Sequence, residues 1–430
     1  MAVIGRFPLL IMLMASVVQA AQGPPARQLD MERAVEIAMG SHAALQAAAV
    51  RVRSTAGLEL QAGLRPNPEF SFQTENWRSW GTPDFSASRD LDIFAYVSQP
   101  IEARGKRARR LEVSTQERRL AELELKALQW RIRQGVRQAF LRALAAQRQL
   151  SIMRESGRNL DQVVEYHQIR VAQGAMAEAD LIRVRLERER LAFAESAAAV
   201  DADRGRADLL KAMGVTGFGA DFELVDASAP QTPGTALTLQ NLLQQARAGR
   251  AEILLAEAGV ERARAQAGFE RAQSRPDLAV IAGYKRTADN NTLLGGVSIP
   301  LPFFNRNQGN ILLSETEIER VEKLKQALVA EVEADIQAAL MAVRRRRAML
   351  GEMEKGMVGR AEESWRISIA AYQEGGADLL RLLDAQRVRN EVQQLLVRTQ
   401  MEYRLSLAEL ESAAGVENIV LSEELLRVAP

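Results

Sequence analysis

The sequence predicts an elongated, mainly α-helical protein with a small β part, built from two copies of one structural unit. Three observations lead to this fold class. Apolar residues recur every three or four positions over long stretches, which is the period of amphipathic helices. A proline-bounded, β-rich segment occurs twice, about two hundred residues apart. Aromatic residues make up only 5% of the chain, a composition typical of long helices.

The repeat is clearest around four predicted strands. The letters LRPNP at residues 64–68 and SRPD at 274–277 each precede a run of β-forming residues. Strands are expected over residues 68–78, 91–99, 278–285 and 293–299. Further along, QGA at 173–175 matches EGG at 374–376. The first unit therefore covers residues 21–213 and the second covers 238–415.

The expected helices have matching lengths in the two units. A helix over 104–172 would be ~100 Å long at 1.5 Å per residue. Two shorter helices, over 30–63 and 177–213, would together cover nearly the same length beside it. The second unit repeats this arrangement with helices over 238–272, 377–414 and 307–371. Helices this long do not fit inside a compact globule, so we expect a coiled-coil rod or tube.

The segments outside the two units have their own signals. Residues 1–20 are expected to be a signal peptide, with Arg6 before a short apolar run and a small-residue cleavage site at Ala20. No cysteine follows that could carry a lipid, and no later segment has ~18 uninterrupted apolar residues. Gly and Pro residues mark 214–237 as a linker. Residues 416–430 are expected to form a C-terminal tail. The chain is therefore expected in the periplasm or, through its strands, in the outer membrane.

The composition argues against several classes of function. Lys and Arg total 56 against 55 Asp and Glu, so no basic excess points to nucleic acid. There is no cysteine, and the two histidines, His42 and His167, lie far apart and are interpreted as surface or groove residues. We expect no metal site, no cofactor and no catalytic constellation. The four arginines at 344–347 are interpreted as a solvated or ion-pairing helix face.

The strands have the length of membrane-crossing strands, ~9–11 residues. Trp77, Trp80 and Tyr284 lie near their ends, where interfacial aromatic residues are expected. Four strands cannot close a barrel, and lipid does not tolerate open sheet edges. Three copies would supply twelve strands, so membrane insertion implies a trimer. Two hairpins in a soluble domain are the other interpretation of these strands.

Two junction motifs extend the pattern, namely VSQPIE at 97–102 followed by GKR at 105–107, and PLPFFNRNQGN at 300–310. With the duplicated layout and the signal peptide, they resemble the TolC-like outer membrane factors, and in particular their CzcC-like heavy-metal branch. The resemblance implies a homotrimer with a twelve-stranded β-barrel in outer-membrane lipid and a periplasmic α-helical barrel. It also implies two partners, a periplasmic adaptor (membrane fusion) protein and an inner-membrane pump of the resistance-nodulation-division type.

The resemblance assigns two kinds of site residue. Small residues at the helix turns would contact the adaptor, or would simply end the helices; they are Gly174, Ala175, Gly375 and Gly376. A pore constriction is implied at Arg381 and Asp384. Asp384 matches an acidic position of the family, whereas Arg381 departs from it. The two residues would either latch neighbouring chains by ion pairs or form an ordinary surface pair on one helix.

The implied function is a passive exit duct for heavy-metal cations, of the cobalt, zinc and cadmium or the copper and silver type. A multidrug or type I secretion duct would have the same fold and a different cargo. A soluble periplasmic coiled-coil adaptor or scaffold is the alternative of another class, and it would be extracted without detergent. The sequence favours no enzyme.

Overall fold

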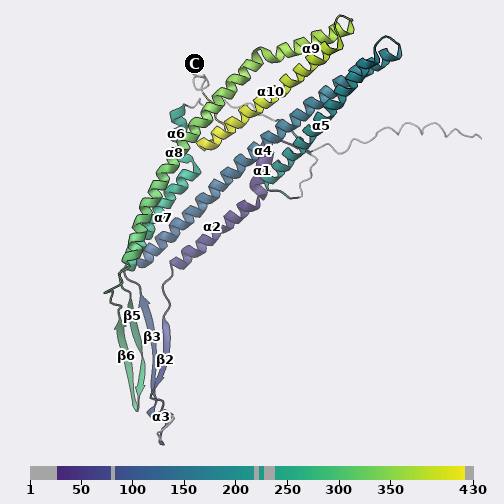
Figure 1. Ribbon diagram of the computed structural model, residues 1–430. Helices are drawn as coiled ribbons and strands as arrows, with labels where there is room; N and C mark the ends of the chain where they lie inside the picture. The colour runs from purple at the N-terminus through teal and green to yellow at the C-terminus, as the bar shows by residue number, and fades with distance from the viewer. Residues whose placement is uncertain (1–26, 79–82, 217–221, 227–237, 422–430) are drawn as a thin grey trace, which may run out of the picture.

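The computed structural model describes residues 27–78, 83–216, 222–226 and 238–421. The molecule is a long rod with a β-sheet at one end and two helical hairpins at the other (Figure 1). Several expectations lie outside the described residues: the signal peptide at 1–20, Trp80, linker residues 217–221 and 227–237, and tail residues 422–430.

The first unit contains two strands between helices, and a further short strand near its start. Its elements are β1 (Arg27–Leu29), α1 (Met31–Ser41), α2 (Ala43–Ala62), β2 (Glu69–Glu75), α3 (Ala87–Asp90), β3 (Asp92–Ile101), α4 (Lys106–Ala172) and α5 (Glu178–Met213). The helix expected over 104–172 is thus α4, and the one expected over 177–213 is α5.

The second unit follows the same order. Its elements are α6 (Leu239–Gly249), α7 (Ala251–Gln273), β5 (Leu278–Thr287), β6 (Asn290–Ser298), α8 (Gln308–Glu352), the π-helical turn η1 (Met353–Met357), α9 (Val358–Gln373) and α10 (Leu379–Ala414). The linker between the units contains a strand that the sequence analysis did not predict, β4 (Phe222–Leu224), which pairs in parallel with β1.

Three expected helices are interrupted. The helix expected over 30–63 breaks at His42 and the one expected over 238–272 breaks at Arg250, where the backbone is extended. His42 begins α2 as its N-cap, because its Nδ1 accepts the Ala44 N–H at 3.2 Å. Arg250 donates to the carbonyl of Ala413 at 3.0 Å, which ties the second break to α10. The breaks let α1 and α6 turn their apolar faces onto cores at mid-height of the rod (Figure 1).

The third interruption is the π-helical turn η1, which divides the helix expected over 307–371. Here one turn of the helix is widened, and the helix changes direction between α8 and α9 (Figure 1). Its counterpart α4 runs for 67 residues without such a turn.

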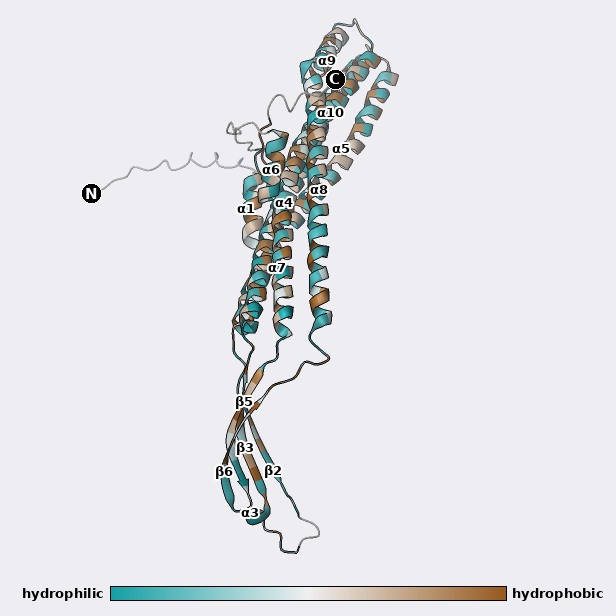
Figure 2. Ribbon diagram, turned by 90° about the vertical axis from the view of Figure 1, so that its left-hand side faces the viewer, coloured by the Kyte–Doolittle hydropathy of each residue, from teal (hydrophilic) through white to brown (hydrophobic). Residues whose placement is uncertain are grey.

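The main sheet has the order β2-β3-β5-β6, and all neighbouring strands are antiparallel. β3 pairs with β5, so the sheet joins the first unit to the second. One face carries most of the large apolar side chains, and five of them are strongly exposed: Phe70, Phe72, Val97, Leu293 and Val297. The residues that alternate with them, on the other face, are more polar, such as Ser71 and Gln73 on β2. Figure 2 shows that the strands contain both hydrophobic and hydrophilic residues. Within the described chain, β2 and β6 each pair on one side only.

The helices form one layer that continues the order of the strands. α4 is central and packs against α2 and α7 in the half near the sheet, and against α5 and α10 in the half near the hairpins. α8 packs against α7 and α10, and α9 against α10. The first-unit core is built around Phe140, whose side chain is 1% exposed. Such burial contributes ~1.5–3 kcal/mol per large apolar side chain. The layer is therefore bounded by α2 and α5 on one side and by α8 and α9 on the other.

None of the described helices combines the length and the apolar character needed to cross a bilayer.

Candidate functional site

The hairpin turns at the tips have the same geometry in both units. Gly174 follows the end of α4 with φ +68°, and its N–H donates to the carbonyl of Val171 at 2.9 Å. The Ala175 N–H donates to the carbonyl of Arg170 at 2.9 Å. These two hydrogen bonds form a turn that ends a helix with a residue in the left-handed conformation, where glycine is favoured. Gly174 therefore has a structural role in the turn.

The second tip repeats the turn one unit later. Gly375 has φ +79° and donates to the carbonyl of Tyr372 at 3.1 Å, and Gly376 donates to that of Ala371 at 2.7 Å. A Cβ atom added to Gly174 or Gly375 would meet no atom within 4 Å. Both turns thus leave open space above the backbone, which a partner could enter.

The two constriction residues lie on the first turns of α10. The Arg381 N–H donates to Asp378, the N-cap, at 2.9 Å. Asp384 accepts from Arg387 at 2.7 Å, and both side chains are more than half exposed. In the described part of the chain, the Arg381 guanidinium lies within ion-pair distance of no carboxylate. The ordinary surface pair on α10 is thus Asp384–Arg387, and not the Arg381–Asp384 pair considered from the sequence.

Arg381 and Asp384 nevertheless share one groove. They lie along an open groove between α9 and α10, together with Arg360, Glu363 and Ile367. Positively charged and carboxylate side chains from both helices line this groove. A charged side chain of another molecule could therefore reach Arg381.

A buried contact between α4 and α9 joins the two units, and the sequence did not predict it. His167 on α4 is completely buried, so its interpretation as a surface or groove residue is wrong. Its Nδ1 lies 2.7 Å from the carbonyl of Val163 and must donate, because a carbonyl only accepts. Its Nε2 lies 2.6 Å from the hydroxyl of Tyr372 on α9, and the rings are stacked at 5.6 Å. Burial raises the pKa of Tyr372 to about 12.

A second contact between the units surrounds Arg389 on α10. Its guanidinium is 2.6 Å from Glu362 on α9 and 3.6 Å from Glu155 on α4. It also lies over the Trp365 ring, 4.5 Å from the centroid. Because Arg389 touches both units, it couples the α9–α10 hairpin to the α4–α5 hairpin.

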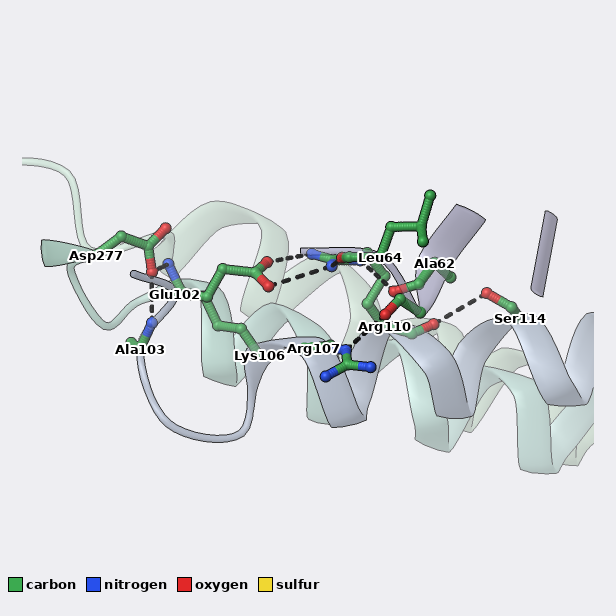
Figure 3. A network of polar contacts seen from close by, with 10 residues as sticks. Ala62, Leu64, Glu102, Ala103, Lys106, Arg107, Arg110, Ser114 and Asp277 are labelled. Atoms are coloured by element: carbon green, nitrogen blue, oxygen red, sulfur yellow. Dashed lines mark hydrogen bonds and ion pairs between the residues drawn. The ribbon is translucent and has the colours of Figure 1, made fainter. Parts of the chain in front are cut away.

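The GKR motif lies in the joint between sheet and helices (Figure 3). Lys106 is buried, and its Nζ is 2.9 Å from Asp277 at the start of β5. Asp277 also accepts the Ala103 N–H at 2.7 Å. Burial opposes ionisation of Asp277, but these two bonds outweigh it and hold the pKa of Asp277 below its usual value.

Two arginines of α4 complete the joint by capping the end of α2 (Figure 3). Arg107 donates to the carbonyl of Gly63 at 2.6 Å. Arg110 donates to the carbonyls of Ala62 at 2.8 Å and Leu64 at 2.9 Å, and pairs with Glu102. These bonds satisfy carbonyls that the helix end leaves without partners. The joint therefore ties both strands of the first unit, and β5, to the helix layer.

Among the described residues, no group of three His, Cys, Asp or Glu side chains could hold a metal ion.

A rod with this duplicated helix layer, an open four-stranded sheet and paired hairpin tips has the architecture of an outer-membrane transport channel. The family model for outer membrane efflux proteins matches residues 34–215 and 242–416. The chain belongs to this family, whose members are channels of the outer membrane rather than a family of enzymes. The two matched segments correspond closely to the two units of the fold.

Three similar proteins define the relationship further. The cobalt-zinc-cadmium resistance protein CzcC of Cupriavidus metallidurans is 29% identical over 374 residues, covering 85% of this chain and 84% of CzcC. The nickel-cobalt-cadmium resistance protein NccC of Alcaligenes xylosoxydans xylosoxydans is 24% identical, covering 73% of this chain and 68% of NccC. A crystal structure of CusC superposes with a TM-score of 0.73 at 19% identity, over 93% of this chain and 96% of CusC. The fold expected from the sequence is confirmed.

Proposed function

We propose that this protein is the outer-membrane channel of a tripartite efflux system and gives heavy-metal cations a passive exit from the cell. The observation that carries the proposal is the similarity to CzcC, a cobalt-zinc-cadmium resistance protein, over 85% of the chain. NccC, which is named for nickel, cobalt and cadmium resistance, supports the same class of cargo. No catalytic step is part of the proposed role, because the pump supplies the energy.

The proposed working form is a homotrimer. Within the described chain, the four-stranded sheet has two unpaired edges, and its large apolar side chains gather on one face. Three copies would supply twelve strands, an even number that is within the bacterial range. A closed sheet leaves no edge in lipid and turns the apolar face outward. The helix layer would close in the same way into a periplasmic tunnel.

The proposed partners are a periplasmic adaptor and an inner-membrane pump of the resistance-nodulation-division type. The adaptor would contact the tips at Gly174, Ala175, Gly375 and Gly376. Open space above Gly174 and Gly375 supports this assignment, because a partner backbone can approach closely there. The open turns face away from the sheet, toward the end of the rod that would be deepest in the periplasm (Figure 1).

The test of cargo is the growth of a deletion strain, with and without the complementing gene, in graded zinc, cadmium, cobalt, nickel, copper and silver. A panel of dyes and antibiotics is tested in parallel. Sensitivity confined to metals supports the proposal and names the ions. Sensitivity confined to organic compounds would replace it with a multidrug duct. A chain that is extracted without detergent would favour the periplasmic scaffold instead.

The proposed constriction is tested separately at Arg381 and Asp384. Arg381 lacks a carboxylate partner within the described chain, which supports a role between chains. Arg381→Ala and Asp384→Ala are expected to raise the single-channel conductance of the protein in planar bilayers. Arg398→Ala is the matched control, because Arg398 carries the same charge on the same helix, lies outside this groove and pairs with Glu402 within the chain. Unchanged conductance and gating in both variants would remove the constriction from the proposal.

A further inference from the structure

A run of apolar residues connects β6 to α8 at the joint between sheet and helices. Residues 299–304 have the sequence IPLPFF, with a polar residue on either side. The side chains of Leu301, Phe303 and Phe304 are 68%, 69% and 93% exposed in the single chain. The connection swings away from the other connections at the joint (Figure 2). Segment 299–304 therefore needs an apolar covering that the described part of the chain does not supply.

The backbone of segment 299–304 has few hydrogen-bond donors that would have to be satisfied. Pro300 and Pro302 have no N–H group. The Phe303 N–H donates to the carbonyl of Leu301 at 2.9 Å, so this donor is satisfied within the segment. An N–H group without a partner is costly in hydrocarbon. A segment with so few of them is therefore suited to the boundary of a bilayer.

Each strand of the sheet is followed or preceded by an arginine at the joint. These arginines lie just before β2, just after β3, just before β5 and between β6 and α8: Arg65, Arg104, Arg275 and Arg306. All four are exposed, and in the described part of the chain none lies within ion-pair distance of a carboxylate. The carboxylates of Glu102 and Asp277 are held by Arg110 and Lys106 instead. The joint therefore has an excess of positive charge.

The opposite end of the sheet has a different charge pattern. Arg89 pairs there with Asp90 at 2.8 Å. Asp92 accepts hydrogen bonds from the side chain of Asn76 and from the Ala288 N–H. Cationic and anionic side chains are thus mixed at that end, whereas unpaired arginines gather at the joint. Guanidinium groups bind phosphate oxygens through paired hydrogen bonds, and a surface of anionic lipid attracts them.

The length of the strands puts the joint at the level of lipid headgroups. β3 and β5 each have 10 residues, or about 33 Å at ~3.3 Å per residue. A strand tilt of ~40° reduces this length to a height of about 25 Å, which is the height of the apolar band of an outer-membrane barrel. Residues directly beyond the strands would then lie at the bilayer surface. Because the tips point into the periplasm in the proposed channel, this surface belongs to the inner leaflet.

We propose that the joint is a phospholipid-binding site, in which segment 299–304 lies in the apolar boundary of the inner leaflet and the four arginines bind the phosphates of anionic phospholipids. The inference rests on the proposed channel, whose sheet crosses the outer membrane. Arg306 shows how one residue joins the two parts of the site. Its Nε donates to the carbonyl of Pro302 at 3.3 Å, which keeps the guanidinium beside the apolar segment. A lipid whose acyl chain contacts Phe304 would place its phosphate near that guanidinium.

Lipid is the occupant that the surroundings of the segment favour. Val297, near the end of β6, is one of the exposed side chains of the apolar face, and Ile299 is 51% exposed two residues later. Successive side chains of a strand alternate between its two faces, so the apolar face of the sheet leads directly into the segment. That face meets lipid in the proposed channel. The arginines at its border match the negative charge of a phosphate.

Quenching by lipids with brominated acyl chains tests the position of the segment. The chain has no cysteine of its own, so Phe304→Cys can carry a single bimane label. In vesicles of brominated phosphatidylcholine, we expect this label on the full-length protein to lose at least about half of its emission, because an interfacial segment lies ~5–10 Å below the surface. Phe193→Cys is the matched control, since Phe193 is 79% exposed on α5 in the hairpin half of the rod. Val97→Cys, on β3, reports whether the sheet itself meets lipid.

A second measurement tests the arginines with the same Phe304→Cys label. Brominated phosphatidylglycerol and brominated phosphatidylcholine are compared at equal mole fractions in vesicles of phosphatidylcholine. Each arginine at a membrane surface favours an anionic lipid roughly fivefold, so brominated phosphatidylglycerol is expected to quench more strongly. Adding Arg104→Gln and Arg306→Gln is expected to lower this preference by about fivefold or more. Arg366→Gln with Arg398→Gln is the matched control, because these arginines lie on α9 and α10 and pair there within the chain.

The outcomes separate this inference from the proposed function. Quenching at Val97→Cys without quenching at Phe304→Cys would overturn the inference alone, because the segment would be covered by another copy or by water. Equal quenching by the two lipids before the arginines are changed would also overturn it. If excess inorganic phosphate at constant ionic strength removes the preference, the arginines take the free anion and the lipid assignment is wrong. No quenching at either position would overturn the proposed channel too, because the sheet would not lie in the bilayer.

Discussion

Replacing Tyr372 by phenylalanine tests whether the buried contact with His167 holds the two hairpins together. Tyr372→Phe removes only the hydroxyl, which lies 2.6 Å from the Nε2 of His167. Because Nδ1 of His167 donates to a carbonyl, Nε2 is the ring nitrogen that can accept, and among the described residues the Tyr372 hydroxyl is the one group that donates to it. His167 is completely buried, so water does not replace the donor without opening the contact. The expected cost is ~1–3 kcal/mol.

This cost falls on the local opening of α9 away from α4. Hydrogen exchange of the amides in Val358–Gln373 and in the last turns of α4 reports that opening. A cost of 1–3 kcal/mol corresponds to exchange that is roughly 5–150-fold faster at these amides. Exchange in α7, which lies in the half of the rod near the sheet, is expected to stay unchanged.

Two further variants complete the test. Tyr166→Phe is the matched control, because Tyr166 meets Tyr372 edge-on at 6.2 Å and its hydroxyl makes no hydrogen bond in the described chain. In the double variant His167→Leu with Tyr372→Phe, both polar partners are gone, so exchange is expected to return toward the wild-type rate. If Tyr372→Phe exchanges at the wild-type rate, or no faster than Tyr166→Phe, the contact does not hold the hairpins together.

Two other predictions concern the joint and the tip. The lowered pKa of Asp277 means that its stabilising pair with Lys106 is fully present above the unfolded-state pKa of ~3.9 and is lost as pH falls through the lower folded-state pKa. Circular dichroism of the protein in detergent between pH 2 and 6 is therefore expected to show an acid-side fall in the unfolding midpoint to which Asp277 contributes. Asp277→Asn is expected to make this fall smaller and to lower the neutral-pH midpoint by about 2–4 °C; a pH profile unaltered from that of the wild type would refute this. Gly375→Val forces a β-branched residue into the left-handed region, at ~1–2 kcal/mol, and is expected to speed amide exchange at the second tip, whereas Gly376→Val is not; equal exchange in the two variants would contradict the assigned turn.

The elements that could be predicted from sequence are those set by local period and by turn chemistry. α4 and α5 begin and end within two residues of expectation, because apolar spacing and glycine turns are local signals. The four strands were found because Pro and Asn bound them, although β5 and β6 pair further toward their hairpin than expected. The strand β4 was missed because three residues carry no period. Its place depends on β1, almost two hundred residues away.

The candidate site was predicted only where its residues follow each other in the chain. The glycine turns are local and were found, with their adaptor role left as a proposal. The partner of Asp384 was not found, because Arg381 and Arg387 are both three residues away and spacing alone cannot choose between them. His167 and Tyr372 lie 205 positions apart, so only the packing of α4 against the second unit brings them together. The breaks at His42 and Arg250 also follow from distant packing, since neither residue is a strong helix breaker.

The π-helical turn η1 distinguishes the two units, although both begin and end their long helices in the same way. One widened turn shifts the faces of the helix beyond it by about one residue's rotation, ~100°. The α9–α10 hairpin therefore leaves its base at a different angle and with a different face inward than the α4–α5 hairpin. In a ring of three chains, the six hairpins would therefore alternate between two kinds. A partner that binds the tips would thus meet threefold rather than sixfold symmetry. It could bind through three identical contacts or through three pairs of unlike contacts.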